Sequence, residues 1–163
     1  RRKDRVQQSI VDFGNEAQRL LNQGQYAAAR QMWHQVLELA PEQPEAWLGL
    51  GQTHLQSGDL DRAVRCLERA VALSPEQGEG LYALGVAYLA TDRAEAAQST
   101  LSEAVAQLPE AAEVRLALGQ AEYRLGHVAA ALASWREAEH LDAEMTGQHP
   151  EVWSYLVDEE VAL

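Results

Sequence analysis

The sequence has few of the residues that form disulfides, metal sites or membrane spans. Its 163 residues include one cysteine, Cys66, which excludes an internal disulfide and a zinc site built from several cysteines. No apolar run reaches the roughly 18 residues that a membrane-spanning helix needs. Lys3 is the single lysine, and 13 basic residues face 25 acidic ones, a net charge of −12. This charge argues against nucleic acid as a partner, because a phosphate backbone is bound by basic surfaces.

The positive charge that is present gathers at the start of the chain. Residues 1–5 carry +3, so the remaining residues carry −15 (−12 less +3). One interpretation is the solvated beginning of a helix. The alternative is the cytoplasmic flank of a membrane anchor upstream of Arg1, because basic residues are enriched on that side of membrane helices. We therefore expect a cytoplasmic domain, with a tether upstream of Arg1 as the alternative.

Four series of residues recur with one period of 34. Alanine stands at 29, 63, 97 and 131, glycine at 51, 85 and 119, and proline at 41, 75 and 109. Gly24 and Gly58 are one period apart, and Gly126 follows two periods later with Asp92 between them. A fixed period of this length indicates stacked copies of one small structural unit. Within each period, apolar residues recur at three- and four-residue steps in two blocks, which predicts two helices per copy.

These residues resemble the signature of the tetratricopeptide repeat family. The second copy carries Trp47, Leu50 and Gly51 in the first block, and the alanine at 63 with Leu67 in the second. The third copy matches at Leu84, Gly85 and Tyr88, and the first and fourth copies match in part. Six signature positions depart from the pattern: Glu16, Val36, His54, Arg115, Glu122 and Ala143.

The resemblance implies an all-α fold, a right-handed superhelical solenoid of about four helix pairs with a C-terminal capping helix. Helices are expected at about 5–23, 26–40, 44–57, 60–73, 78–91, 94–107, 112–125 and 128–141. A linker at 142–149 then leads to a last helix at 150–161, whose Val152, Trp153, Leu156 and Val157 cover the fourth pair while Asp158, Glu159 and Glu160 face water. The alternative is that this helix docks into the groove of another copy or into its own. The expected divisions are a basic lead-in at 1–9, repeats at 10–43, 44–77, 78–111 and 112–145, and the linker and capping helix at 146–163.

Two details of the turns and the packing follow from residue type. Glycine tolerates a left-handed backbone, so Gly58 and Gly126 are expected in the turns between paired helices. Gly51 facing Ala63, and Gly85 facing Ala97, would let the two helices of a pair approach closely.

In this family the first helices of the pairs line a concave face, and five positions of each repeat point into it. Apolar side chains bordered by amides would suit an amphipathic helix or an extended peptide. The open alternative is that part of this stripe is core between helices. Carried onto this chain, the groove comprises Gln18, Leu48, Gln52, Leu55, Tyr82, Val86, Leu89, Leu116, Gln120, Tyr123 and Arg124.

The charge of the partner can be inferred from what the groove lacks. Repeats that bind the acidic tails of heat-shock chaperones use lysine, arginine and asparagine at positions that correspond here to Gly14, Gln18, Gly49, Glu79 and Ala83. Glu45, Glu79 and Glu113 would also repel an acidic tail, so a neutral or basic protein partner is expected. Alternatively, these glutamates simply favour the first turns of their helices, where the helix dipole attracts negative charge.

Nothing in the sequence predicts an enzyme, a cofactor or a metal site. The histidines at 34, 54, 127, 140 and 149 include no pair at the i, i+4 spacing of metal ligands on a helix. Cys66 falls in a second helix and is interpreted as a packing residue. The favoured function is a non-catalytic protein-protein interaction scaffold that binds a partner peptide or helix and assists complex assembly. The alternatives are a self-associating structural module and a regulatory domain of a longer membrane-anchored protein. The arginine-, alanine- and glutamine-rich composition is typical of bacterial chains.

Overall fold

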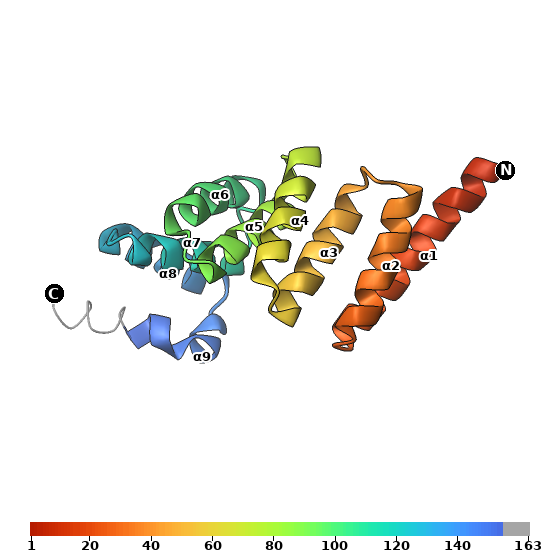
Figure 1. Ribbon diagram of the computed structural model, residues 1–163. Helices are drawn as coiled ribbons and strands as arrows, with labels where there is room; N and C mark the ends of the chain where they lie inside the picture. The colour runs from red at the N-terminus through yellow and green to blue at the C-terminus, as the bar shows by residue number, and fades with distance from the viewer. Residues whose placement is uncertain (155–163) are drawn as a thin grey trace.

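The computed structural model describes residues 1–154, except for the side chain of Thr146. Successive helices follow one another from one end of the molecule to the other (Figure 1). Residues 150–154 are also helical. The helices are α1 (Arg2–Asn22), α2 (Tyr26–Leu39), α3 (Pro44–Ser57), α4 (Leu60–Leu73), α5 (Gly78–Ala90), α6 (Ala94–Gln107), α7 (Ala112–Arg124), α8 (Val128–Leu141) and α9 (Met145–Gln148).

The helices form two layers with different packing. Each odd-numbered helix from α1 to α7 packs most extensively against the even-numbered helix that follows it. Within the described residues, the backbones of α1 and α3, of α3 and α5, and of α5 and α7 also lie close together, whereas the backbones of α2, α4, α6 and α8 stay further apart from one another. The odd-numbered helices therefore form the inner, concave layer of a solenoid, and the even-numbered helices diverge on the outer, convex layer.

The turns between paired helices follow the 34-residue period in backbone conformation. Gly24, Gly58 and Gly126 have φ values of 73°, 86° and 80°, and Asp92 at the corresponding place has a φ of 58°. Glycine adopts this left-handed conformation without steric cost, and aspartate is among the few other residues that tolerate it. The predicted turns are confirmed, and α3, α4, α6 and α8 have the predicted bounds.

Each prolyl residue of the 34-residue series lies just after an outer helix. Helices α2, α4 and α6 end two residues before Pro41, Pro75 and Pro109. The intervening residues have non-helical backbones, for example Ala40 with a φ of −144° and a ψ of 84°. Steric contact between a proline ring and the preceding residue disfavours the helical conformation there. The prolines therefore end the second helix of each of the first three pairs and redirect the chain to the next pair.

The glycines of the inner helices allow close packing, although not against the residues predicted. A Cβ atom at Gly51 would lie 2.6 Å from Cγ of Leu67, and one at Gly85 would overlap Leu101. The expected partners Ala63 and Ala97 are therefore not the nearest side chains. Because Leu67 and Leu101 are fully buried, the missing Cβ atoms make room for large core residues on the outer helices.

The end of the solenoid is covered by the segment after α8. Met145, Val152 and Trp153 are buried in one cluster with Trp135 of α8, and the Trp153 indole Nε1 donates to the Met145 carbonyl at 3.0 Å. The expected linker at 142–149 is wrong in part, because it contains helix α9. The other residues predicted to form the cap, Leu156, Val157, Asp158, Glu159 and Glu160, lie outside the described residues.

We predict that Gly119→Ala destabilises the fold, because a Cβ atom there would overlap the Trp135 ring, which is rigid and 2% exposed. Overpacking of this kind costs about 1–3 kcal/mol and outweighs the better helix propensity of alanine. Chemical denaturation measures the effect. The matched control is Gly80→Ala, whose added Cβ would lie 3.6 Å from Val71 and should leave stability unchanged or raised by about 1 kcal/mol. Equal stability of the two variants would contradict the packing explanation.

Candidate protein-binding groove

The concave layer contains a hollow of about 360 Å³ where α1, α3 and α5 meet. Each of these helices contributes side chains that face the concave side of the solenoid. They come from the second half of α1 and α3 and from the middle of α5. We call this surface the concave groove. It is lined by Gln18, Leu21, Gln52, Leu55, Gln56, Tyr82, Ala83 and Val86.

The lining combines apolar side chains with amides. Leu55, Tyr82 and Val86 are half-buried, so part of each side chain remains open to a ligand. Gln18 is exposed and donates to Asn22 at 3.0 Å, and Gln52 is half-buried. Apolar surface supplies contact area, and amides both donate to and accept from a peptide backbone. The structure thus brings together five of the predicted groove residues.

Three predicted groove residues lie in the core instead. Leu48, Leu89 and Leu116 are only 5–6% exposed. Leu48 packs in a cluster with Leu67, and Leu116 packs with Trp135. Because neighbouring inner helices contact each other, a side chain that points along the inner layer is covered by the next pair. These three leucines therefore offer a partner almost no surface.

The remaining predicted residues lie on α7, apart from the residues that line the concave groove. Gln120 is half-buried, and the Tyr123 ring is 38% exposed with its centroid 5.6 Å from that of Trp135. Arg124 Nη1 donates to the Leu89 carbonyl at 2.6 Å and lies 3.7 Å from Asp92. Arg124 therefore joins the ends of α5 and α7.

Three lining residues, Leu21, Gln56 and Ala83, were absent from the predicted set of groove residues, and the sequence contained a signal for Ala83. Ala83 corresponds to one of the positions at which repeats of the family that the sequence resembles bind the acidic tails of chaperones. In this chain Ala83 lines the hollow. Gly49 is another of the positions that bind acidic tails in that family. It is buried here, and the Trp33 ring of α2 occupies the space where its Cβ would lie.

Negative charge borders the concave layer. Glu45, Glu79 and Glu113 are exposed in the first turns of α3, α5 and α7. Burial raises the pKa of the Tyr82 hydroxyl, and the nearby Glu113 carboxylate raises it further, so the tyrosine is neutral at physiological pH. Both interpretations of the three glutamates, partner selection and helix-dipole stabilisation, agree with this placement.

Comparison with known families identifies the repeat. Three tetratricopeptide repeat models match the chain at residues 15–78, 55–121 and 112–137. The chain belongs to the tetratricopeptide repeat family. A comparison with curated protein sequences returns no match.

Solved structures share the fold of this tetratricopeptide repeat chain. A MamA fragment from Desulfovibrio magneticus RS-1 is 22% identical with a TM-score of 0.82, and the match covers 93% of this chain and 86% of that one. YrrB, described as a TPR protein with an unusual peptide-binding site, is 21% identical with a TM-score of 0.75 over 93% of this chain and 79% of that one. A mutant of Thermobaculum terrenum O-GlcNAc transferase is 28% identical with a TM-score of 0.69, over 72% of this chain but only 23% of the enzyme.

The residues considered for catalysis or metal binding are not gathered into a site. Within residues 1–154, no group of three histidine, cysteine or acidic side chains could hold a metal ion. Burial raises the pKa of the Cys66 thiol, which disfavours the reactive thiolate. The buried Glu122 carboxylate accepts a hydrogen bond from Ser134 at 2.5 Å. No helix among the described residues is long and apolar enough to cross a membrane.

His54 is a buried histidine at a position where the tetratricopeptide signature has tyrosine, as at Tyr88 one repeat later. Its side chain is 7% exposed, and Nδ1 has no hydrogen-bond partner among the described residues. Burial lowers the pKa of His54, an effect that Asp59 at 3.9 Å opposes and that Arg30 and Arg62 reinforce. The fold therefore holds the imidazole neutral.

We predict that the free energy of unfolding falls as the pH is lowered below about 6.5, the pKa of an unperturbed histidine. In that range the unfolded chain takes up a proton at His54 that the folded chain excludes. The free energy of unfolding therefore falls with decreasing pH by at most about 1.4 kcal/mol per pH unit for this group. Denaturation of the wild type and of His54→Gln between pH 7.5 and 5.5 measures the difference. The variant should lose stability less steeply, and parallel slopes would contradict the assignment.

Proposed function

We propose that this tetratricopeptide repeat chain is a non-catalytic protein-protein interaction scaffold that binds a peptide or helix of a partner in its concave groove. The observation that carries the proposal is the half-buried set Leu55, Tyr82 and Val86 beside three glutamines. Apolar side chains left open beside amide groups are a typical surface for peptide recognition. Such binding would assist the assembly of a complex.

The chemistry of the groove indicates which partners it accepts. Leu55 and Val86 offer places for apolar anchors, and Gln52 can bond a peptide backbone whatever the peptide's side chains are. The exposed Glu45 and Glu79 favour a neutral or basic segment over an acidic one, mainly through the rate of association. The small size of the hollow suits a transient contact of modest affinity.

The comparisons support this proposal at the level of the fold. The structure of YrrB is described as having a peptide-binding site, and the fold of that protein is shared by this chain. The fold is also shared by MamA over most of both chains. The match to O-GlcNAc transferase spans less than a quarter of that enzyme and so gives no support for the same activity here.

We predict that Tyr82→Glu combined with Val86→Glu abolishes capture of a specific set of proteins from the source cell's extract. Both side chains line the concave groove, and a charge placed against a bound apolar anchor costs at least about tenfold in affinity. Mass spectrometry identifies the captured proteins. Calorimetric titration with a synthetic segment of the leading candidate then measures the loss directly.

The matched control is Val128→Glu, which places the same charge on an apolar residue of α8 that is 42% exposed and outside the concave groove. Circular dichroism verifies that every variant remains helical. If the control and the groove variant capture the same proteins, the concave groove is not the binding surface.

The second candidate function is self-association, in which the apolar side chains of the concave groove would contact a second copy of the chain. Binding to a different protein predicts that the isolated chain is a monomer at micromolar concentration. Light scattering coupled to size-exclusion chromatography measures the mass. A dimer that dissociates in the Tyr82→Glu/Val86→Glu variant would replace the partner-binding function with the self-associating one.

A further inference from the structure

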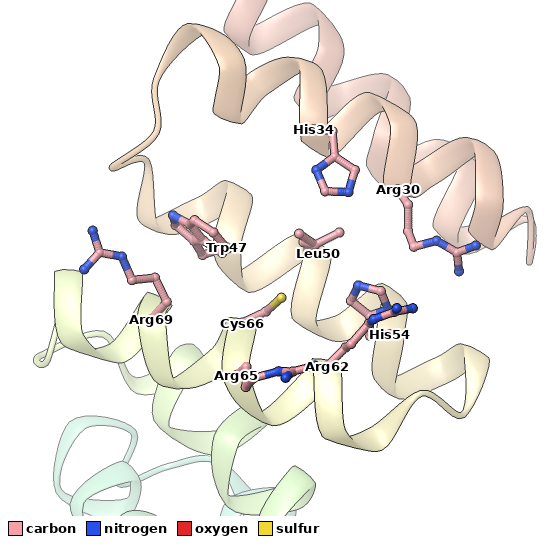
Figure 2. A pocket seen from close by; sticks show the side chains of 9 residues that line it. All are labelled: Arg30, His34, Trp47, Leu50, His54, Arg62, Arg65, Cys66 and Arg69. Atoms are coloured by element: carbon pink, nitrogen blue, oxygen red, sulfur yellow. The ribbon is translucent and has the colours of Figure 1, made fainter.

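The convex layer contains a second hollow, of about 510 Å³, between α2 and α4. The backbones of these two outer helices stay apart, so the inner helix α3 forms the floor between them. Figure 2 shows side chains from all three helices around this space. We call it the convex pocket. It lies on the layer opposite the concave groove and shares no lining residue with it.

The walls of the convex pocket are strongly basic in a chain that is strongly acidic. Arg30 comes from α2, and Arg62, Arg65 and Arg69 come from α4. These are four of the 12 arginines in a sequence of net charge −12. No carboxylate is among the lining residues. Such a concentration of one charge sign on a surface of the other sign attracts a negatively charged ligand.

Much of this positive charge is not neutralised by neighbouring acids. Arg62 pairs with Asp59 at 3.0 Å, and Arg69 lies 3.8 Å from Glu42. Among the described residues, Arg30 and Arg65 make no ion pair. The side chains of Arg62 and Arg69 are also 65% and 47% exposed, so their guanidinium groups can still reach a ligand.

The floor of the convex pocket is apolar. Leu50 and Cys66 lie at its centre and Trp47 lies at one side, as Figure 2 shows. Leu50 and Cys66 are only 3% and 9% exposed, so Trp47 supplies most of the apolar surface that a ligand can reach. Trp47 is half-buried, and its Nε1 donates to the Pro41 carbonyl at 2.8 Å, so the indole nitrogen is already satisfied. His54 lies at the other end beside Arg62 (Figure 2). A ligand that fits must therefore combine negative charge with an apolar group.

We propose that the convex pocket binds an acidic segment of a partner protein, with at least two carboxylates on the arginines and one apolar side chain on the floor. Guanidinium groups bind carboxylates through paired, charge-assisted hydrogen bonds. The proposal concerns a different surface from the concave groove, and it requires a partner segment of the opposite charge to the one proposed there.

The spacing of the arginines favours a peptide over a small free anion. Arg62, Arg65 and Arg69 are related by steps of three and four residues, so they share one side of α4. At 1.5 Å per residue they extend over about 10 Å, the length of about three residues of extended chain. A single phosphate could contact only one end of this row and would leave the apolar floor uncovered.

Fluorescence anisotropy with a short labelled peptide that alternates glutamate and leucine tests the proposal on the full chain. We expect saturable binding that weakens with added salt, because the contacts are partly exposed ion pairs. The double variant Arg30→Gln/Arg65→Gln should bind at least about tenfold more weakly. These two arginines are chosen because they make no ion pair among the described residues, so their removal leaves the fold intact, which circular dichroism verifies.

Two controls separate this site from other causes of binding. Arg136→Gln removes an exposed arginine of α8 outside the pocket and should leave the affinity unchanged. Tyr82→Glu/Val86→Glu should also leave it unchanged, so failure of the concave groove and failure of the convex pocket are distinguished. In a nitrogen-proton correlation spectrum, the Trp47 indole signal should move when the peptide is added to the wild type.

Three results would overturn the proposal. The first is equal affinity of the wild type and the Arg30→Gln/Arg65→Gln variant. The second is equal affinity for a peptide in which glycine replaces every leucine, which would mean that charge attraction alone causes binding and that the apolar surface of Trp47 is not used. The third is that sodium phosphate binds as tightly as the peptide, which would make the convex pocket a simple anion site.

Discussion

The contact between neighbouring helix pairs is the constraint on which the rest of this structure depends. A single pair cannot bury its apolar face alone, so each pair is stabilised by the next one. Within a pair, the glycines at 51, 85 and 119 allow Leu67, Leu101 and Trp135 of the outer helix to pack against the inner one. Between pairs, Gly49 of α3 makes room for the Trp33 ring of α2. The backbones of the inner helices lie close together while those of the outer helices stay further apart. The concave groove and the convex pocket are both consequences of this difference between the layers.

The fold could be predicted from the sequence because its decisive features are local and repeated. A left-handed turn needs glycine or a substitute such as Asp92, and a proline ends the preceding helix, whatever lies elsewhere in the chain. Each signal recurs with the same period, so one copy supports the interpretation of the others. The departure at 142–149, where α9 replaces a linker, falls where the period ends and this support is absent.

The groove could be predicted only in part, because helical periodicity gives the direction of a side chain but not what covers it. Leu55 and Leu89 occupy the same place in successive repeats, yet Leu55 is half-buried and lines the concave groove while Leu89 is 6% exposed. Leu89 is packed with Leu101 and Ala117, which belong to α6 and to the next pair. The convex pocket was not predicted at all, although Arg62, Arg65 and Arg69 are visible on one side of α4. Arg30, the fourth arginine of the pocket, comes from the preceding repeat, so the row on α4 alone does not indicate the pocket. A net charge of −12 for the whole chain also gives no sign of a local cluster of positive charge.

The concave groove and the convex pocket, as proposed, present opposite charges to a partner. Glutamates stand at the beginnings of α3, α5 and α7, where the helix dipole stabilises them, and four arginines of α2 and α4 line the convex pocket. Because the concave groove and the convex pocket share no residue, occupation of one surface leaves the other accessible. A partner segment that fits one surface as proposed would be repelled by the charge at the other, which would lower binding at the wrong surface. If both surfaces are occupied as proposed, this short solenoid would hold two chains of opposite charge in fixed relation to each other, which is the physical requirement for a scaffold.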